Sequence, residues 1–338
     1  MTRVLGRALV AMAALLVTLA GVAGCGGRQT DTTADTGAPV TCTVGTDTRV
    51  SIATGNTTGV YYTLGNAYAE QLAAATDGKL KATAAETGAS VQNIQQLVAD
   101  QYQVAFSLFD TATDAVNGTG TFTSPQPVQA LARIYDNYTH VVVRADAGIT
   151  TVADMKGKAI STGSPKSGTE VIADRLLQSA GLNPETDITP QRLDLTKSVD
   201  GMKDGSIDGL IWSGGLPTPG LTDLFTTLGA QVTFLDITPL LPQMQQINPA
   251  YQSATIPAAT YKTAADVPTI AVPNVLLVKD NIDANTACVL TKTLFDKKDE
   301  LVKANAAAKG INLDNARHTE PVPLNRGAAT ALDQLGAN

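Results

Sequence analysis

Short apolar runs alternate with segments of helical periodicity over the first third of the chain. Runs at 50–53, 79–85 and 103–108 have the length and composition of strands. Between the first two runs, the apolar residues recur on one face of a helix: Tyr61, Leu64, Tyr68 and Leu72. After the second, another helix is predicted by the spacing of Val91, Ile94, Leu97 and Val98. This alternation favours a mostly parallel sheet.

The same unit recurs further along. Strands are expected at 128–135, 140–144, 158–161, 207–212 and 269–278. A helix buries Ile172, Ala173, Leu176 and Leu177 and stops at Gly181. Thr151 to Asp154 reads as a capping box, and a last long helix is expected over 285–308.

The pattern therefore predicts an α/β protein with two lobes and a ligand cleft between them. The first lobe would comprise residues 49–136 plus about 240–338, and the second about 137–239. Each lobe has glycine-rich loops after its strands, where ligands gather in open α/β sheets.

The beginning of the chain has the pattern of an export signal. Arg3 and Arg7 precede an apolar run at 8–20, and Val22-Ala23-Gly24-Cys25 follows. Residues 22–25 resemble a bacterial lipobox, which predicts a signal peptide at 1–24 and a lipid on Cys25. A plain signal peptide or a short membrane anchor is the alternative. Residues 25–48, rich in Thr, Asp and Gly, would form a flexible tether, and the protein would sit on the extracytoplasmic face of the cell membrane.

Charge and cysteine content narrow the choice of partners and compartment. The net charge of the chain is −7, and no run of Lys and Arg occurs, so nucleic acid is not an expected partner. Loss of the two arginines with the signal would make it −9 (−7 − 2). In an oxidising compartment Cys42 and Cys288 are expected to form a disulfide, with two free buried thiols as the alternative.

Two loops at predicted helix starts are candidate anion sites. The first contains Thr54, Gly55 and Asn56, and the second Ser167, Gly168 and Thr169. Free N–H groups and the helix dipole attract anions at such positions. A tight turn or an ordinary helix cap is the structural alternative. Gly163 and Gly168 have the spacing of a phosphate loop, but Thr169-Glu170 stands where Lys-Ser/Thr is required, so nucleotide binding is rejected.

Other polar and aromatic residues are candidates for the wall of the cleft. They are Tyr62 (preferred to Tyr61, which also fits a core position), Asn93, Ser107, Asp110, Trp212 and Gly214. Asp110 would suit a ligand ammonium or simply cap its helix. Arg133 is a weaker candidate for a ligand carboxylate, and Arg144 is expected in a surface ion pair.

Catalysis finds little support in the sequence. The only histidines, His140 and His318, accompany no nucleophile motif, and no metal-ligand spacing occurs. We therefore expect no cofactor, no metal and no enzymatic activity. An exported hydrolase is the remaining enzyme alternative, because catalytic triads are recognised by geometry.

The order and spacing of several motifs carry a family resemblance over about residues 49–328. These motifs are Thr54 to Gly65, Thr87 to Asn93, Gln103 to Gly118, Val142 to Asp146, Met155 to Lys158, Ser167 to Glu170, Gly214 to Pro217 and Pro321 to Leu324. Together they resemble the TAXI-type substrate-binding proteins of TRAP transporters.

The resemblance implies a type II periplasmic-binding fold and a ligand such as glutamate, glutamine or a related small carboxylate. It also implies delivery to a TRAP-type membrane permease by a monomer. Asn56, Thr57, Leu108, Phe109, Lys166 and Asn325 depart from the family pattern. A ligand-sensing subunit of a membrane signalling system would have the same binding site and stays open as an alternative.

Overall fold

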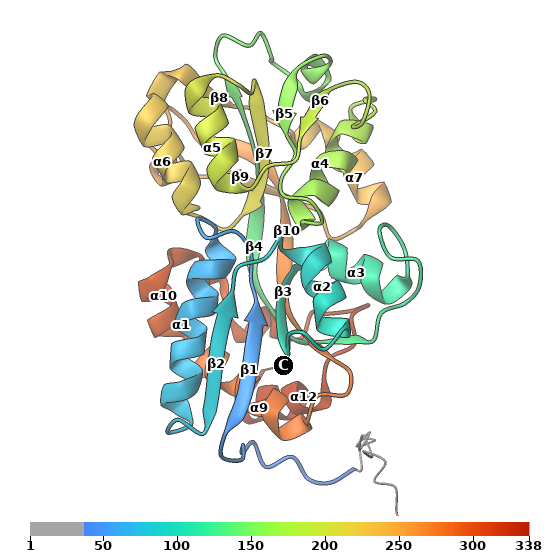
Figure 1. Cartoon of the computed structure of the whole chain (residues 1–338), viewed down its shortest axis with the longest axis vertical. Coiled ribbons are helices and arrows are strands. Elements are labelled where there is room, and N and C mark those ends of the chain that lie inside the picture. The colour runs from blue at the N-terminus through green and yellow to red at the C-terminus, as the bar shows by residue number, and fades with distance from the viewer. Residues whose placement is uncertain (1–36, 338) are drawn as a thin grey trace, which may run out of the picture. The chain divides into compact units, whose positions relative to one another are not determined.

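Two long strands, β4 (Val128–Arg144) and β10 (Val267–Lys279), lie side by side in the middle of the sheet (Figure 1). They belong to a computed structural model that describes residues 37–337. The predicted signal peptide, Cys25 and the first part of the predicted tether lie outside the described residues. The strands expected at 128–135 and 140–144 form the single strand β4, because the polar residues between them also pair with β10 on one side and β7 on the other.

The first lobe contains the strands and helices at the beginning of the described chain together with those at its end. Its strands are β1 (Thr48–Ala53), β2 (Leu80–Ala85) and β3 (Val104–Leu108). Its helices are α1 (Val60–Ala75), α2 (Ser90–Val98), α3 (Phe109–Asn117), α9 (Ala284–Asp296), α10 (Lys298–Ala304), η4 (Ala306–Gly310), α11 (Leu313–Ala316) and α12 (Arg326–Gln334).

The second lobe contains the elements between the two long strands. Its strands are β5 (Ala159–Ser161), β6 (Thr189–Gln191), β7 (Gly209–Gly214), β8 (Val232–Phe234) and β9 (Gln252–Ile256). Its helices are η1 (Val152–Met155), α4 (Gly168–Ser179), α5 (Leu195–Asp204), α6 (Pro219–Leu228), η2 (Gly229–Gln231), η3 (Thr238–Leu240), α7 (Leu241–Ile247) and α8 (Ala258–Tyr261).

The strands form one mixed sheet in the order β2-β1-β3-β10-β4-β7-β5-β6, with β8 added to β4 and β9 to β10. Only the outer pairs are parallel: β1 with β2 and β3, and β5 with β6 and β7. The pairs made by β4 and β10 are all antiparallel. The expectation of a mostly parallel sheet is therefore wrong at the centre, where the chain passes from one lobe to the other and back along the same two strands.

Hydrophobic periodicity correctly locates the buried faces of the main helices. α1 buries Tyr61, Leu64, Tyr68 and Leu72, and α4 buries Ile172, Ala173, Leu176 and Leu177. The capping box of η1 is present as predicted. The long helix expected over 285–308 is instead broken into α9, α10 and η4. At the second break Asn305 is extended, and its side chain accepts a hydrogen bond from the backbone N–H of Ala307.

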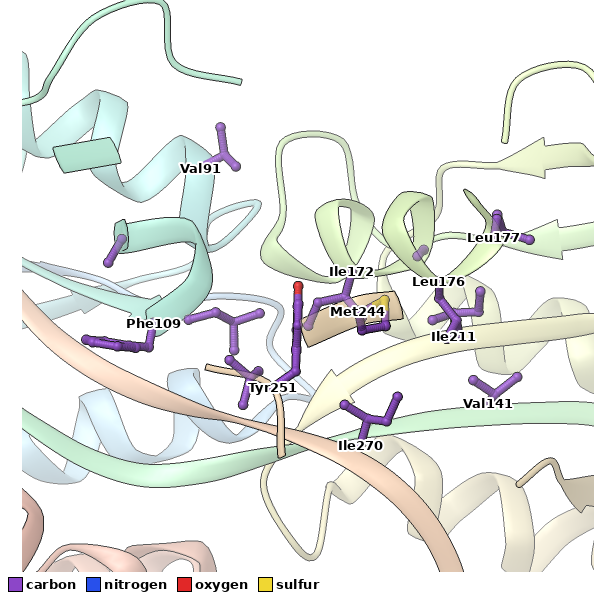
Figure 2. Close-up of a cluster of buried hydrophobic side chains, with 14 of the residues drawn as sticks. Val91, Phe109, Val141, Ile172, Leu176, Leu177, Ile211, Met244, Tyr251 and Ile270 are labelled. Atoms are coloured by element: carbon purple, nitrogen blue, oxygen red, sulfur yellow. The ribbon is translucent and has the colours of Figure 1, made fainter. Parts of the chain in front are cut away.

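One apolar cluster continues from the first lobe into the second (Figure 2). It includes Phe109 of α3, Ile172 of α4 and Met244 of α7, and Figure 2 shows Tyr251 standing among them. Because α7 packs on α4 and α8 on α6, residues 241–261 lie with the second lobe. We therefore propose that the return to the first lobe occurs within β10, instead of near residue 240.

A disulfide joins Cys42 to Cys288 of α9, with the two Cα atoms 5.1 Å apart. Next to it, Asn285 accepts hydrogen bonds from the backbone N–H and the hydroxyl of Thr41. The predicted pairing of Cys42 with Cys288 is confirmed. Within the segment predicted as a tether (residues 25–48), Thr41 and Cys42 are therefore attached to the first lobe.

This disulfide gives a direct chemical expectation for the purified protein. Alkylation of the denatured chain without reductant should label neither Cys42 nor Cys288, and both should be labelled after reduction. Intact-mass measurement distinguishes the two states. Labelling of both thiols before reduction would contradict the bond.

Candidate functional site

A small cavity lies between the two lobes. It offers about 30 Å³ of space for the centre of a water molecule, far less than the ~300–1,000 Å³ of a drug-sized pocket. Its walls consist of Gly55, Asn56, Gly59, Val60, Tyr61, Gly88, Ala89, Ser90, Leu108, Asn137, Ser167, Gly168, Thr169, Trp212, Ser213, Gly214 and Gly215. None of these side chains is charged.

Three helices begin at this cavity. The first residues of α1 and α2 come from the first lobe, and those of α4 come from the second. The first N–H groups of a helix have no acceptor within the helix, and the helix dipole is positive at that end. Three such ends facing a cavity without counter-charges create a positive potential that favours an anion.

The end of β7 supplies further donors. Ser213 is 6% exposed, and its Oγ has no hydrogen-bond partner among the described residues. The indole Nε1 of Trp212 is also buried and without a partner in the same part of the chain. Both residues line the cavity. Because buried polar groups are normally satisfied, these two atoms identify the wall where a ligand oxygen would be held.

Three polar side chains brace the two long strands beside the cavity. The hydroxyl of Tyr61 donates to Asn274 Oδ1 (2.5 Å), and Asn274 Nδ2 donates to Asn137 Oδ1 (2.8 Å). Asn137 Nδ2 in turn donates to the carbonyl of Ser213 (3.2 Å). Burial raises the pKa of Tyr61 well above its usual value, so its hydroxyl stays protonated and remains a donor.

Asn56 ties the lobes together at the mouth of the cavity. Its Nδ2 donates to Ser164 Oγ (3.1 Å), and its Oδ1 accepts from the backbone N–H of Leu195 (3.1 Å). Nearby, the backbone N–H of Gln92 donates to the carbonyl of Lys166 (3.0 Å). These bonds cross from the first lobe to the second, so the structure is a closed form.

Seven of the twelve residues expected at the ligand line the cavity: Gly55, Asn56, Ser167, Gly168, Thr169, Trp212 and Gly214. The other five do not line it: Thr54, Tyr62, Asn93, Ser107 and Asp110. Tyr61 lines the cavity, whereas Tyr62, the preferred candidate for its wall, does not. Asn137 and Ser213 are not among the predicted site residues. Asn137 lies in the polar stretch between two expected strands and Ser213 just past the end of another, and nothing in the sequence marks either as a ligand contact.

The remaining candidates are engaged within the protein. Thr54 Oγ1 donates to the carbonyl of Ala85, and Ser107 Oγ donates to that of Leu108. Asn93 is fully buried and donates to the carbonyls of Thr54 and Phe106, which holds β1, β3 and α2 together. These side chains support the loops of the cavity without reaching into it.

Asp110 is committed to a buried ion pair that crosses between the lobes. Its Oδ2 is 2.9 Å from Arg175 Nη1 of α4 and accepts a hydrogen bond from the Tyr251 hydroxyl at 2.5 Å. Arg175 also pairs with Asp114 at 2.5 Å. Burial lowers the pKa of Arg175, but Tyr251, Asp110 and Asp114 outweigh it, so the pKa rises and the guanidinium stays charged. The other oxygen of Asp110, Oδ1, accepts from the backbone N–H of Thr111 (2.7 Å), so both oxygens are engaged within the protein.

The two arginines considered at the sequence level lie away from the cavity. Arg133 pairs with Asp136 at 3.1 Å, and Arg144 forms the expected exposed pair with Asp146. Among residues 37–337, no group of three or more His, Cys, Asp or Glu side chains is arranged to hold a metal ion. Over the same range, no helix has both the length and the apolar character needed to cross a membrane.

His140 of β4 is buried against Phe234 and Tyr261, with Nε2 3.0 Å from the Tyr261 hydroxyl. Burial lowers its pKa from 6.5 to about 4, so the folded protein keeps it neutral while the unfolded chain gains a proton below pH 6.5. The contribution of His140 to stability is therefore fully present above pH 6.5 and is lost as pH falls towards 4.

This shift predicts a specific sensitivity to acid. At about 1.4 kcal/mol per pH unit, His140 should lower the free energy of unfolding by about 2 kcal/mol between pH 6.5 and pH 5. Urea unfolding of the wild type and of His140→Gln at pH 7.5 and pH 5 measures the difference. An equal loss in both proteins would disprove the assignment to His140.

The two α/β lobes joined by β4 and β10, with the cavity between them, define a type II periplasmic-binding-protein fold. Two solved structures share the arrangement. A protein of Bordetella bronchiseptica RB50 is 21% identical, with a TM-score of 0.52 over 86% of this chain and 89% of that one. The binding component of an ABC phosphonate transporter from Pseudomonas aeruginosa is 12% identical, with a TM-score of 0.53; the match covers 78% of this chain and 80% of that one.

A family model matches residues 52–336, and the chain belongs to the NMT1-like family. The expectation that it is not an enzyme agrees with this family.

Proposed function

We propose that the protein is an extracytoplasmic solute-binding lipoprotein that captures a small anion between its lobes and delivers it to a membrane permease. The observation that carries the proposal is the meeting of three helix N-termini, two from one lobe and one from the other, at a cavity without charged side chains. Neither lobe alone provides the full set of donors, so the anion would be bound completely only after closure.

Closure follows from this division of the donors. A ligand shifts an equilibrium only by its different affinity for the two states. An anion seated on α1 and α2 gains the N–H groups of α4 when the second lobe approaches. The bonds of Asn56 to Ser164 and Leu195 then hold the closed form that a permease would recognise.

The finer assignment rests on the motif resemblance. We propose a permease of the TRAP type served by TAXI receptors, a lipid anchor at Cys25, and glutamate, glutamine or a related small carboxylate as the first ligands to test. The neighbour named as the binding component of a phosphonate transporter supports an anion as the ligand. Chemical crosslinking in the native membrane, followed by identification of the captured protein, tests the partner. A sensor kinase in place of a permease would favour the signalling alternative.

Ligand capture is tested by thermal and chemical unfolding of the full chain in detergent with a panel of carboxylates and neutral sugars. A ligand at about 100 times its dissociation constant should raise the free energy of unfolding by about 2.7 kcal/mol. Stabilisation by at least one anion and by no sugar is expected. Stabilisation by a sugar alone would reject the anion-binding proposal.

A further inference from the structure

The lining of the cavity is rich in hydrogen-bond donors and contains no anionic side chain to balance a positive charge. Its lining includes no Asp or Glu. The two amide oxygens that face it are already used, since Asn56 Oδ1 accepts from Leu195 N–H and Asn137 Oδ1 accepts from Asn274 Nδ2. An ammonium group enclosed here would therefore be desolvated without a counter-ion, which is strongly unfavourable.

The backbone carbonyls of the lining are largely occupied as well. That of Gly55 accepts from Thr87 N–H, that of Asn56 from Gly59 N–H, and that of Ser213 from Asn137 Nδ2. The carbonyl of Gly215 accepts from the Thr218 hydroxyl. A ligand donor would have to share each of these oxygens with the bond that it already accepts.

The hydroxyls of Ser167, Thr169 and Ser213, by contrast, are free to donate. Ser167 Oγ accepts from Glu170 N–H, and Thr169 Oγ1 accepts from Ser213 N–H, which leaves each hydroxyl hydrogen available. Ser213 Oγ and Trp212 Nε1 have no partner among the described residues. With the N-termini of α1, α2 and α4, these groups form a set of donors around a space for only a few atoms.

We infer that the ligand is a small oxyanion with a single negative charge and no ammonium group, such as a short monocarboxylate, and that amino acids are excluded. The inference rests on the proposed function, because it specifies the anion that the same cavity takes: among the ligands proposed above it keeps the small carboxylates and removes glutamate and glutamine. Helix ends and neutral donors stabilise one charge, whereas a second negative charge would remain without a counter-ion. An amino acid would bring its ammonium to a wall that has no carboxylate to balance the charge.

Matched ligand pairs test the inference in titration calorimetry on the full chain in detergent. Lactate and alanine differ in a hydroxyl against an ammonium, and propionate and malonate differ by one carboxylate on a three-carbon skeleton, so all four ligands are small. We expect lactate and propionate to bind at least tenfold more tightly than alanine and malonate. Equal or tighter binding of alanine, or of the dianion malonate, overturns the inference.

Two serine variants locate the binding event. Ser213 and Ser179 both have buried hydroxyls without a partner, but only Ser213 lines the cavity. Ser213→Ala should weaken monocarboxylate binding about tenfold, and Ser179→Ala should leave it unchanged. Equal effects of the two changes overturn the assignment to this wall.

The proposed function and the inference fail in different ways. Amino acid binding that is lost in Ser213→Ala would keep the anion receptor and reject the exclusion of ammonium. No binding of any anion by the folded protein would reject both.

Discussion

Replacing Arg175 by leucine is expected to lower the free energy of unfolding by about 3–5 kcal/mol. The change leaves Asp110, whose side chain is 0% exposed, without its cation and close to Asp114. Tyr251 would still donate to Asp110, but one neutral hydrogen bond does not replace a guanidinium that serves two carboxylates. Because the pair joins α3 of the first lobe to α4 of the second, part of the loss should appear as separation of the lobes.

Urea unfolding measures the loss, and small-angle scattering without ligand detects the separation as a larger radius of gyration. Arg192→Leu is the matched control, since Arg192 also pairs with two carboxylates but at an exposed site. That change should cost less than about 1 kcal/mol. A free energy of unfolding within 1 kcal/mol of the wild type, with an unchanged radius, would mean that the buried cluster does not hold the lobes.

Replacing Gly168 by valine should weaken ligand binding about a hundredfold. A Cβ atom at Gly168 would lie 2.5 Å from Leu108 Cδ1 and 2.7 Å from Ser90 Oγ. Both neighbours belong to the first lobe, whereas Gly168 begins α4 of the second. Overpacking a closed contact costs about 1–3 kcal/mol. The open form escapes this cost, so the substitution acts mainly on closure, and about 2.7 kcal/mol corresponds to a hundredfold in affinity.

Calorimetry with the tightest ligand of the panel gives the affinity, and scattering with saturating ligand gives the shape. Gly45→Val is the control, because a Cβ at Gly45 meets nothing within 4 Å. A Gly168→Val protein that keeps wild-type affinity and becomes as compact with ligand as the wild type would show that the lobes do not need to meet at this point.

The sequence was sufficient for the local elements and for the loops that carry the site. The apolar stripes predicted all three helices that begin at the cavity, and the loops with Gly55 and Gly168 marked two of their starts as candidate anion sites. The same stripes indicated which helix faces are buried. These features depend on residues close together in the chain, where periodicity and turn chemistry are informative.

The partners of polar residues could not be read in the same way. Asp110 follows a strand towards the cleft, yet its charge is taken by Arg175, 65 positions later. Asn137 looks like an interruption of an apolar run, but it holds Asn274 and Ser213 across three strands. The contact between Asn137 and Asn274 depends on the return of β10 beside β4, and the sequence pattern does not predict that these two strands are neighbours.

The disulfide also determines how the molecule would carry a mechanical load. A pulling force applied to the chain before Cys42 passes through the disulfide into α9, so residues 43–53 do not carry this force. β1, which pairs with strands on both sides, is therefore spared from being peeled out of the sheet. Force transmitted from the proposed membrane anchor would therefore enter the first lobe through α9, and the second lobe would carry none of it.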